Sequence, residues 1–288
     1  MAMSLHTLIS AGTYLVAKSG LSEFDPLVFA FFRFALASII LSAIIVFRKY
    51  GFPFSKSEWP LLILLAVLAI PLNQCMFLYG LQFTLPTHSA LLYATTPVWV
   101  YLLSAWRKQE NMTRAKTMGI FIALIGVTAF FLEKGLAMKT DYLLGDSIIL
   151  IAVWSWATYT VLGRPIVRQK GAVVVTSYVL ILGTLMYFPF GLYLASGFDY
   201  SGVTWIGWSG IAYTAILTSV VAYIIWYWSM KRMEPSRTAI FMNLQPIVTA
   251  LLAYIIMGER LSAGTAISGA IIIMGVYIVQ RQVKTNNV

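Results

Sequence analysis

The chain consists largely of apolar runs of about 20 residues, each bounded by charge, glycine or proline. A run of that length in helical form crosses the hydrocarbon core of a bilayer, whereas strands of alternating polarity are not evident. Hydrophobic residues make up 60% of the chain and charged residues 10%, which excludes a water-soluble enzyme. We therefore predict an all-α integral membrane protein of ten transmembrane helices, centred near Ser10, Ser38, Ile70, Val98, Leu124, Trp154, Leu185, Ser219, Leu251 and Ile272.

Positive charge is concentrated in alternate loops. Three basic residues, Lys134, Lys139 and Arg260, fall in the intervening loops. Fifteen fall in the other loops and the C-terminal tail: Arg48, Lys49, Lys56, Arg107, Lys108, Arg114, Lys116, Arg164, Arg168, Lys170, Lys231, Arg232, Arg237, Arg281 and Lys284. The positive-inside rule then puts these loops and both termini in the cytoplasm. The net charge of +10 thus serves insertion and contact with anionic lipid, and we expect no binding of nucleic acid.

An internal repeat relates the two halves of the chain. Shifting the chain by 149 residues aligns, without a gap, Pro86 with Pro235, Ala90 with Ala239, Pro97 with Pro246, Glu110 with Glu259 and Gly126 with Gly275. Each repeat then holds five helices, and an odd number of spans makes the second repeat enter the membrane from the opposite side. We predict two inverted five-helix repeats, residues 1–134 with helices 1 to 5 and residues 143–284 with helices 6 to 10.

Three segments carry a family resemblance: FFRFALAS (31–38), PVWVYLLSAWRKQENMTRAKTMGIFIALIGVTAF (97–130) and PIVTALLAYIIMGERLSAGTAISGAIIIMGVYIV (246–279). They resemble the two EamA-type repeats of the drug/metabolite transporter superfamily in its ten-helix form. The resemblance implies a multi-pass protein of the inner (plasma) membrane. Ala11 and Gly12 stand where the family has a Trp–Gly pair. No cleavable signal sequence is evident, so we expect the first span to be retained.

The chemical inventory favours secondary transport over catalysis. The sequence has no glycine-rich phosphate loop, and His6, His88 and the single Cys75 are not at metal-ligand spacing. All ten acidic residues are predicted to lie in loops or at helix ends, so no convergent set of catalytic groups is expected within the spans. We expect no enzyme activity, no cofactor and no bound metal.

Amides close to prolines are the first candidate substrate-binding residues. Asn73 and Gln74 follow Pro71, and Asn243 and Gln245 precede Pro246. A proline in a helix frees a backbone carbonyl, so polar backbone and polar side chains coincide at these places. The amides either line a cavity between the repeats or join helices by hydrogen bonds. Both interpretations remain open.

Mid-span aromatic residues and one lysine complete the candidate site. The aromatic candidates are Tyr79, Tyr93, Trp99, Trp154 and Trp226, chosen from a group that also holds Trp156, Tyr159, Tyr223 and Trp228. Such rings can bind cations or flat solutes, or simply pack against lipid. Lys18 is expected to line the cavity. Arg33 is expected to extend to the membrane surface near Glu23 and Asp25.

From the resemblance we expect an exporter of small organic metabolites that works by alternating access between the repeats. Amino acids or related amines are the leading substrates, and a multidrug or aromatic-cation efflux carrier is the alternative. An intramembrane enzyme and a non-transporting sensor are weaker alternatives. The expected partners are a small-molecule substrate and membrane lipid. Small residues four apart, such as Gly264 and Ser268, fit packing within one chain better than a homodimer, which stays an alternative.

Overall fold

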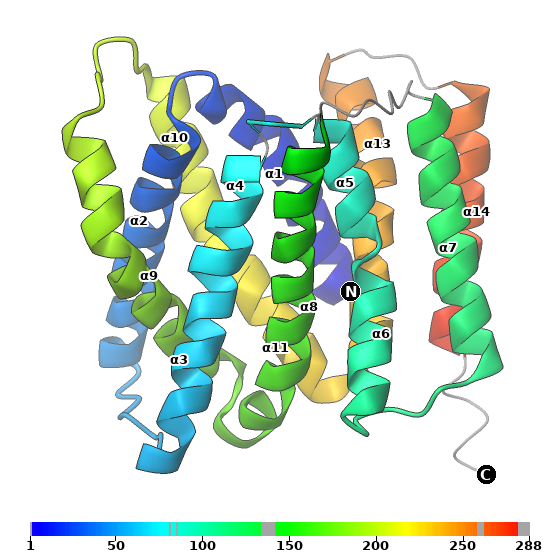
Figure 1. The fold of residues 1–288 in the computed structure, drawn as a ribbon, viewed down its shortest axis with the longest axis horizontal. Coiled ribbons are helices and arrows are strands. Elements are labelled where there is room, and N and C mark those ends of the chain that lie inside the picture. The colour runs from blue at the N-terminus through cyan, green and yellow to red at the C-terminus, as the bar shows by residue number, and fades with distance from the viewer. Residues whose placement is uncertain (1, 81, 85, 134–141, 258–261, 282–288) are drawn as a thin grey trace.

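The structure is a computed structural model that describes residues 2–80, 82–84, 86–133, 142–257 and 262–281. Within these ranges, the side chains at positions 14, 15, 17–19, 86–88, 90, 253, 256 and 257 are outside the description. The described chain is helical throughout and contains no strand, as the apolar runs predict (Figure 1).

The first half of the chain contains a series of helices with short connections. They are α1 (Ala2–Leu21), α2 (Pro26–Phe47), the turn η1 (Lys56–Glu58), α3 (Trp59–Val67), the π-helix η2 (Leu68–Cys75), α4 (Met76–Gly80), α5 (Pro86–Ala94), α6 (Thr96–Trp106) and α7 (Arg114–Glu133). The second half has α8 (Leu143–Lys170), α9 (Ala172–Ser196), α10 (Trp205–Tyr213), the π-helix η4 (Thr214–Ala222), α11 (Tyr223–Arg232), α12 (Pro235–Ala239), the 3₁₀ segment η5 (Ile240–Leu244), α13 (Gln245–Met257) and α14 (Ala263–Arg281).

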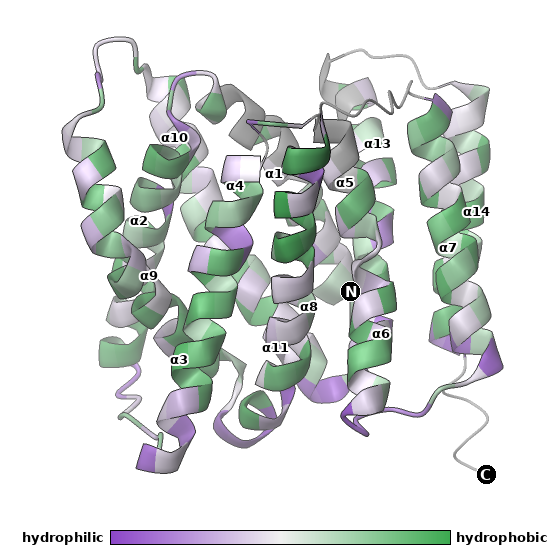
Figure 2. Cartoon of the chain, in the orientation of Figure 1, coloured by the Kyte–Doolittle hydropathy of each residue, from purple (hydrophilic) through white to green (hydrophobic). Residues whose placement is uncertain are grey.

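Seven helical stretches of the described chain are long and apolar enough to cross a membrane. They are Pro26–Phe47, Lys56–Gly80, Arg114–Glu133, Leu143–Lys170, Ala172–Ser196, Trp205–Arg232 and Ala263–Arg281. Hydrophobic residues cover most of each stretch, and hydrophilic residues gather at the lower ends of the helices and in their connections (Figure 2). The chain is therefore a multi-pass membrane protein.

Helices α7 and α14 pack closely along one edge of the molecule (Figure 1). Glycines make this approach possible, because a Cβ atom on Gly119 would lie 2.9 Å from the Gly275 carbonyl oxygen. A Cβ on Gly275 would lie 2.5 Å from the backbone nitrogen of Ala123. Small residues let backbones meet in this way, so this glycine-lined face is used within the chain.

Gly275→Ala is expected to destabilise the protein by about 1 to 3 kcal/mol, because the new methyl group meets backbone that cannot move aside. Gly269→Ala is the matched control on the same helix, since its Cβ would find its nearest neighbour at 3.7 Å, an ordinary contact. Thermal unfolding of the two purified variants measures the difference. Equal melting temperatures would show that the α7–α14 contact tolerates a methyl group.

Helix irregularities occur at places that the 149-residue shift relates. The π-helix η2 contains Pro71, and the shift carries that position to residue 220 inside the π-helix η4. Residue 95, where α5 ends and α6 begins, is carried to residue 244, the last residue of η5. Breaks of this kind expose backbone polar groups, and in membrane proteins they persist where they line a cavity or are covered by protein.

Candidate functional site

Buried aromatic side chains from α1, α8 and α11 form one group, which we call the aromatic cluster: His6, Trp156, Tyr159, Tyr223, Trp226 and Tyr227. The ring of Trp156 is central, with its centroid 5.2 Å from Tyr159 and 5.3 Å from both Tyr223 and Trp226. These rings are spaced for direct π contact. They come from elements far apart in sequence, so the cluster holds α1, α8 and α11 together.

Several polar atoms of the aromatic cluster have no hydrogen-bond partner among the described residues. They are the indole nitrogen of Trp156 and the hydroxyl groups of Tyr159 and Tyr223, each fully buried. Trp226, in contrast, donates from its indole nitrogen to the Thr160 hydroxyl at 3.2 Å. A buried donor without an acceptor costs free energy, so the aromatic cluster holds three hydrogen-bonding groups that the described residues leave unused.

Asn73 and Tyr93 are brought together by hydrogen bonds. The Asn73 side-chain nitrogen donates to the Tyr93 hydroxyl and to the carbonyl oxygen of Ala152, both at 2.8 Å. Gln74 donates to the Asn73 side-chain oxygen at 2.5 Å. Asn73 is completely buried, so its amide joins η2 to α5 and α8.

Asn243 differs from Asn73 in its hydrogen bonding. It is 1% exposed, and its side-chain oxygen has no partner among the described residues. The segment η5 that carries it contacts α1, α5, α6, α7 and α14, which belong to both halves of the chain. Gln245 begins α13 and is also buried. Asn243 therefore offers a free acceptor where the two halves meet.

The other predicted residues are spread over the molecule. Trp99 and Trp154 form a pair with ring centroids 5.4 Å apart, although Trp154 is 46% exposed. Tyr79 is 41% exposed and packs against Phe83 rather than with the other candidates. Trp226 belongs to the aromatic cluster. Lys18 lies on α1, but its side chain falls outside the description.

The expectation that Arg33 extends to the membrane surface is wrong. Arg33 is 6% exposed and donates from Nε to the Ser219 hydroxyl in η4 at 2.8 Å. The two acids expected near its guanidinium, Glu23 and Asp25, instead accept hydrogen bonds from backbone N–H groups at the starts of helices. Asp25 accepts from the backbone nitrogen of Leu27 at 2.8 Å, and Glu23 accepts from the backbone of Thr204 at 2.9 Å. The Thr204 hydrogen bonds lower the pKa of Glu23 below its ordinary value.

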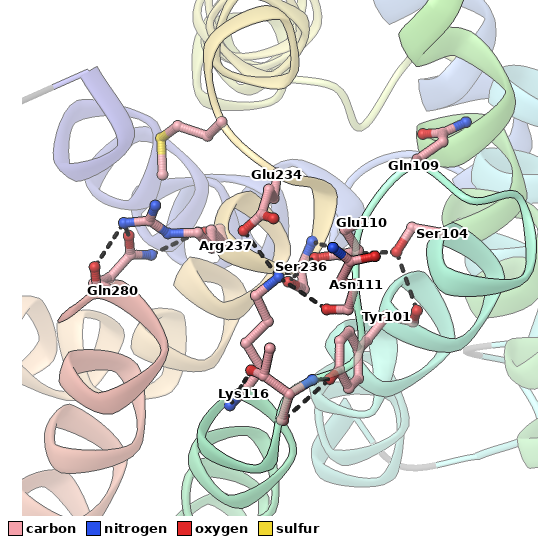
Figure 3. A network of polar contacts seen from close by, with 12 residues as sticks. Tyr101, Ser104, Gln109, Glu110, Asn111, Lys116, Glu234, Ser236, Arg237 and Gln280 are labelled. Carbon is pink, nitrogen blue, oxygen red and sulfur yellow. Dashed lines mark hydrogen bonds and ion pairs between the residues drawn. The ribbon is translucent and has the colours of Figure 1, made fainter. Parts of the chain in front are cut away.

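A second polar centre surrounds Glu110, which follows α6; we call it the Glu110 network (Figure 3). Its buried carboxylate accepts hydrogen bonds from Ser104, from Lys116 at 3.1 Å, and from the backbone and hydroxyl of Ser236 at 3.2 and 2.5 Å. Lys116 also pairs with Glu234 at 2.9 Å. The network ties the α6–α7 connection to α12, which is 126 residues away in sequence at Ser236.

A cavity of about 370 Å³ lies near that network but holds none of the predicted site residues. It is lined by Lys108, Gln109, Arg164, Pro165, Arg168 and Gln169. The guanidinium of Arg164 already donates to the carbonyl oxygens of Met230, Gln109 and Met233 at 2.9 to 3.1 Å. Three of its five N–H donors are therefore used in holding α8 to the end of α11 and to the α6–α7 connection, and we assign no ligand to this cavity.

Comparison with known proteins identifies the family. The sequence model of the EamA-like transporter family matches residues 1–132 and again residues 143–281. The chain belongs to this family. It is therefore a membrane transporter and not an enzyme, as the resemblance of its three segments implies.

Relatives of this EamA-like chain cover nearly its whole length. An uncharacterized transporter of Archaeoglobus fulgidus is 32% identical over 96% of this chain and 95% of its own. The uncharacterized transporter YyaM of Bacillus subtilis is 28% identical, and the match covers 94% of this chain and 89% of YyaM. The WALLS ARE THIN 1 protein of Arabidopsis thaliana is 24% identical, and the match covers 93% of this chain and 79% of the plant protein. One solved crystal structure of a protein superposes on this chain with a TM-score of 0.82. The match covers 97% of this chain and 95% of the other at 18% sequence identity, so the two share the fold.

Sequence reasoning did not select three features of this EamA-like transporter. Arg33 was the clearest signal, because a single arginine inside an apolar run is costly to bury in a membrane and generally has a function. Trp156 and Tyr223 stood among the mid-span aromatics without being chosen, since an apolar helix does not reveal which of its faces meets protein. Burial of the Glu110 carboxylate depends on Ser236, and no local pattern relates the two.

Proposed function

We propose that this EamA-like protein is a secondary transporter that exports small organic metabolites, with amino acids or related amines as its substrates. It works by alternating access between two inverted five-helix repeats, residues 1–134 and 143–284. The seven stretches described above, together with α1, α5–α6 and α12–α13, make up the ten spans. The protein lies in the inner membrane with both termini in the cytoplasm.

The paired helix irregularities are the observation that carries the proposal. The two π-helices and the two breaks lie at positions related by the same 149-residue shift that aligns the prolines. Interrupted helices at corresponding positions of two repeats are a feature of transporter binding sites. Asn243 lies at one of these breaks, and its side-chain oxygen has no hydrogen-bond partner in the described part of the chain. The double match of the family model, to residues 1–132 and 143–281, also supports a two-repeat organisation.

An aromatic-cation efflux carrier is the second candidate, and the aromatic cluster favours it. Trp156, Tyr223 and Trp226 present ring faces that attract cations. The cluster also contains donors for which the described residues offer no acceptor, and such donors suit an anionic or carbonyl group better than a cation. This second property favours amino acids over purely cationic solutes.

Counterflow in proteoliposomes tests the proposal. Vesicles that contain the purified protein and millimolar unlabelled amino acid should take up the same labelled compound transiently, with saturation as the outer concentration rises. No ATP is required, because exchange is driven by the solute itself. Protein-free vesicles are the control. A panel of amino acids and amines without any saturable exchange would refute the proposed function and would favour a non-transporting sensor.

A further inference from the structure

Arg33 is a cation placed inside the helical bundle. It lies seven residues after Pro26, the first residue of α2, which corresponds to about 10 Å along the helix axis. With 6% of its surface exposed, its guanidinium cannot be solvated as a surface arginine is. Ionisable groups at such depth are expensive to keep and generally have a function.

The described contacts of Arg33 supply it with no negative charge. Its Nε donates to the Ser219 hydroxyl at 2.8 Å, and the guanidinium carbon lies 4.8 Å from the centre of the Phe34 ring. No carboxylate of the described residues forms an ion pair with it. A guanidinium has five N–H donors, so most of them are available for another acceptor. A buried cation without an anion is destabilising, so an anion supplied by a ligand fits this position.

Tyr223 extends the set of donors around Arg33. It follows Ser219 by four residues, so the two side chains lie on the same side of the η4–α11 helix. Arg33 donates to Ser219 on that side, so Tyr223 lies on the helix face that Arg33 contacts. The Tyr223 hydroxyl is buried and has no partner among the described residues. The ring centroid of Trp156 lies 5.3 Å from that of Tyr223, and the buried indole N–H of Trp156 also has no partner among the described residues.

We propose that Arg33 and the Tyr223 hydroxyl bind the carboxylate of the transported solute. The guanidinium offers two parallel N–H groups that match the two oxygens of a carboxylate, and the phenol adds a third donor. The same cation repels solutes that carry only positive charge, so simple amines and aromatic cations are poor substrates. This inference rests on the proposed transport function and narrows its substrates to organic carboxylates, zwitterionic amino acids included.

Matched solute pairs in the counterflow experiment test the inference. Alanine and phenylalanine are each compared with the corresponding amide, and phenylalanine also with phenethylamine, which lacks the carboxylate. The wild-type protein should exchange both amino acids and should exchange the carboxylate-free partners at least about 10-fold less well. A charge-assisted hydrogen bond of ordinary strength accounts for such a ratio.

Variants then assign the effect to the two side chains. Arg33→Gln should raise the half-saturation concentration for the amino acids by about 10-fold to 100-fold. Arg33→Lys should raise it by less, because lysine keeps the positive charge but lacks the two parallel N–H groups of the guanidinium. Tyr223→Phe, which keeps the ring, should raise it by about 3-fold to 10-fold. Arg48→Gln is the matched control, since Arg48 is exposed at the C-terminal end of the same helix.

The outcomes separate this inference from the function on which it rests. Exchange of the amides and amine as readily as the amino acids would overturn the carboxylate site and leave transport standing. An unchanged half-saturation concentration in Arg33→Gln would also overturn it. No exchange of any compound by the wild type would refute the transport proposal itself, and this inference with it. Should Arg33→Gln fail to fold, an unchanged half-saturation concentration in Tyr223→Phe rejects the site and a raised one supports it.

Discussion

Replacing Glu110 by alanine is expected to lower the free energy of unfolding by about 3 kcal/mol, because the change removes the buried one of the two carboxylates that pair with a buried lysine. Lys116 is 3% exposed and lies 3.1 Å from the Glu110 carboxylate. It keeps its second contact with Glu234 at 2.9 Å, so we expect a value at the lower end of the range for broken buried pairs. The hydroxyl and backbone N–H of Ser236 lose their acceptor as well.

Thermal unfolding of the detergent-solubilised protein measures this effect. Glu58→Ala is the matched control, because Glu58 lies in an exposed turn and pairs with Lys170 at 3.5 Å, where solvent screens the charges. Glu58 also accepts two exposed hydrogen bonds from Ser55, so the melting temperature of Glu58→Ala should fall, but by clearly less than that of Glu110→Ala. Adding Lys116→Met to Glu110→Ala should restore part of the loss, since the buried charge that has lost one of its two carboxylates is then removed and the remaining carboxylate partner is exposed enough to be solvated. Equal melting temperatures for Glu110→Ala and Glu58→Ala would contradict this account.

The membrane fold was predictable because its signals are local. Each apolar run is read from about 20 neighbouring residues, and the structure turns seven of them into helices such as Pro26–Phe47 and Ala172–Ser196 that are able to span a bilayer. Family membership was predictable for a related reason. The motif around Arg33 and the stretch that begins at Pro246 are each one continuous run of sequence.

The environment of individual side chains was not predictable in the same way. Trp154 and Trp156 are two residues apart on α8, yet Trp154 is 46% exposed and Trp156 is 7% exposed. A membrane helix is apolar on its lipid face and on its protein face, so no polar stripe distinguishes the two. The same limit applies to Arg33, whose surroundings depend on Ser219, 186 residues further along the chain.

Asn243 and Asn73 are expected to respond differently to the same substitution, although both amides lie beside prolines in the sequence. Asn243→Ala should raise the half-saturation concentration for a transported solute by about 5-fold to 100-fold, which corresponds to about 1 to 3 kcal/mol. Its buried side-chain oxygen has no hydrogen-bond partner among the described residues, and we propose that it accepts from a substrate N–H group. The melting temperature should change little, since the described residues offer that oxygen no hydrogen bond to lose.

Asn73→Ala should instead lower the melting temperature, because it deprives the Ala152 carbonyl and the Tyr93 hydroxyl of a donor at 2.8 Å. The expected cost is about 1 to 2 kcal/mol, in line with hydrogen bonds between membrane helices. Transport by the folded fraction should keep its half-saturation concentration. Both quantities are measured on both purified variants, so each serves as the control for the other. A lower melting temperature with unchanged substrate affinity in Asn243→Ala would place that amide among the groups that join helices, and the binding site would then lie elsewhere.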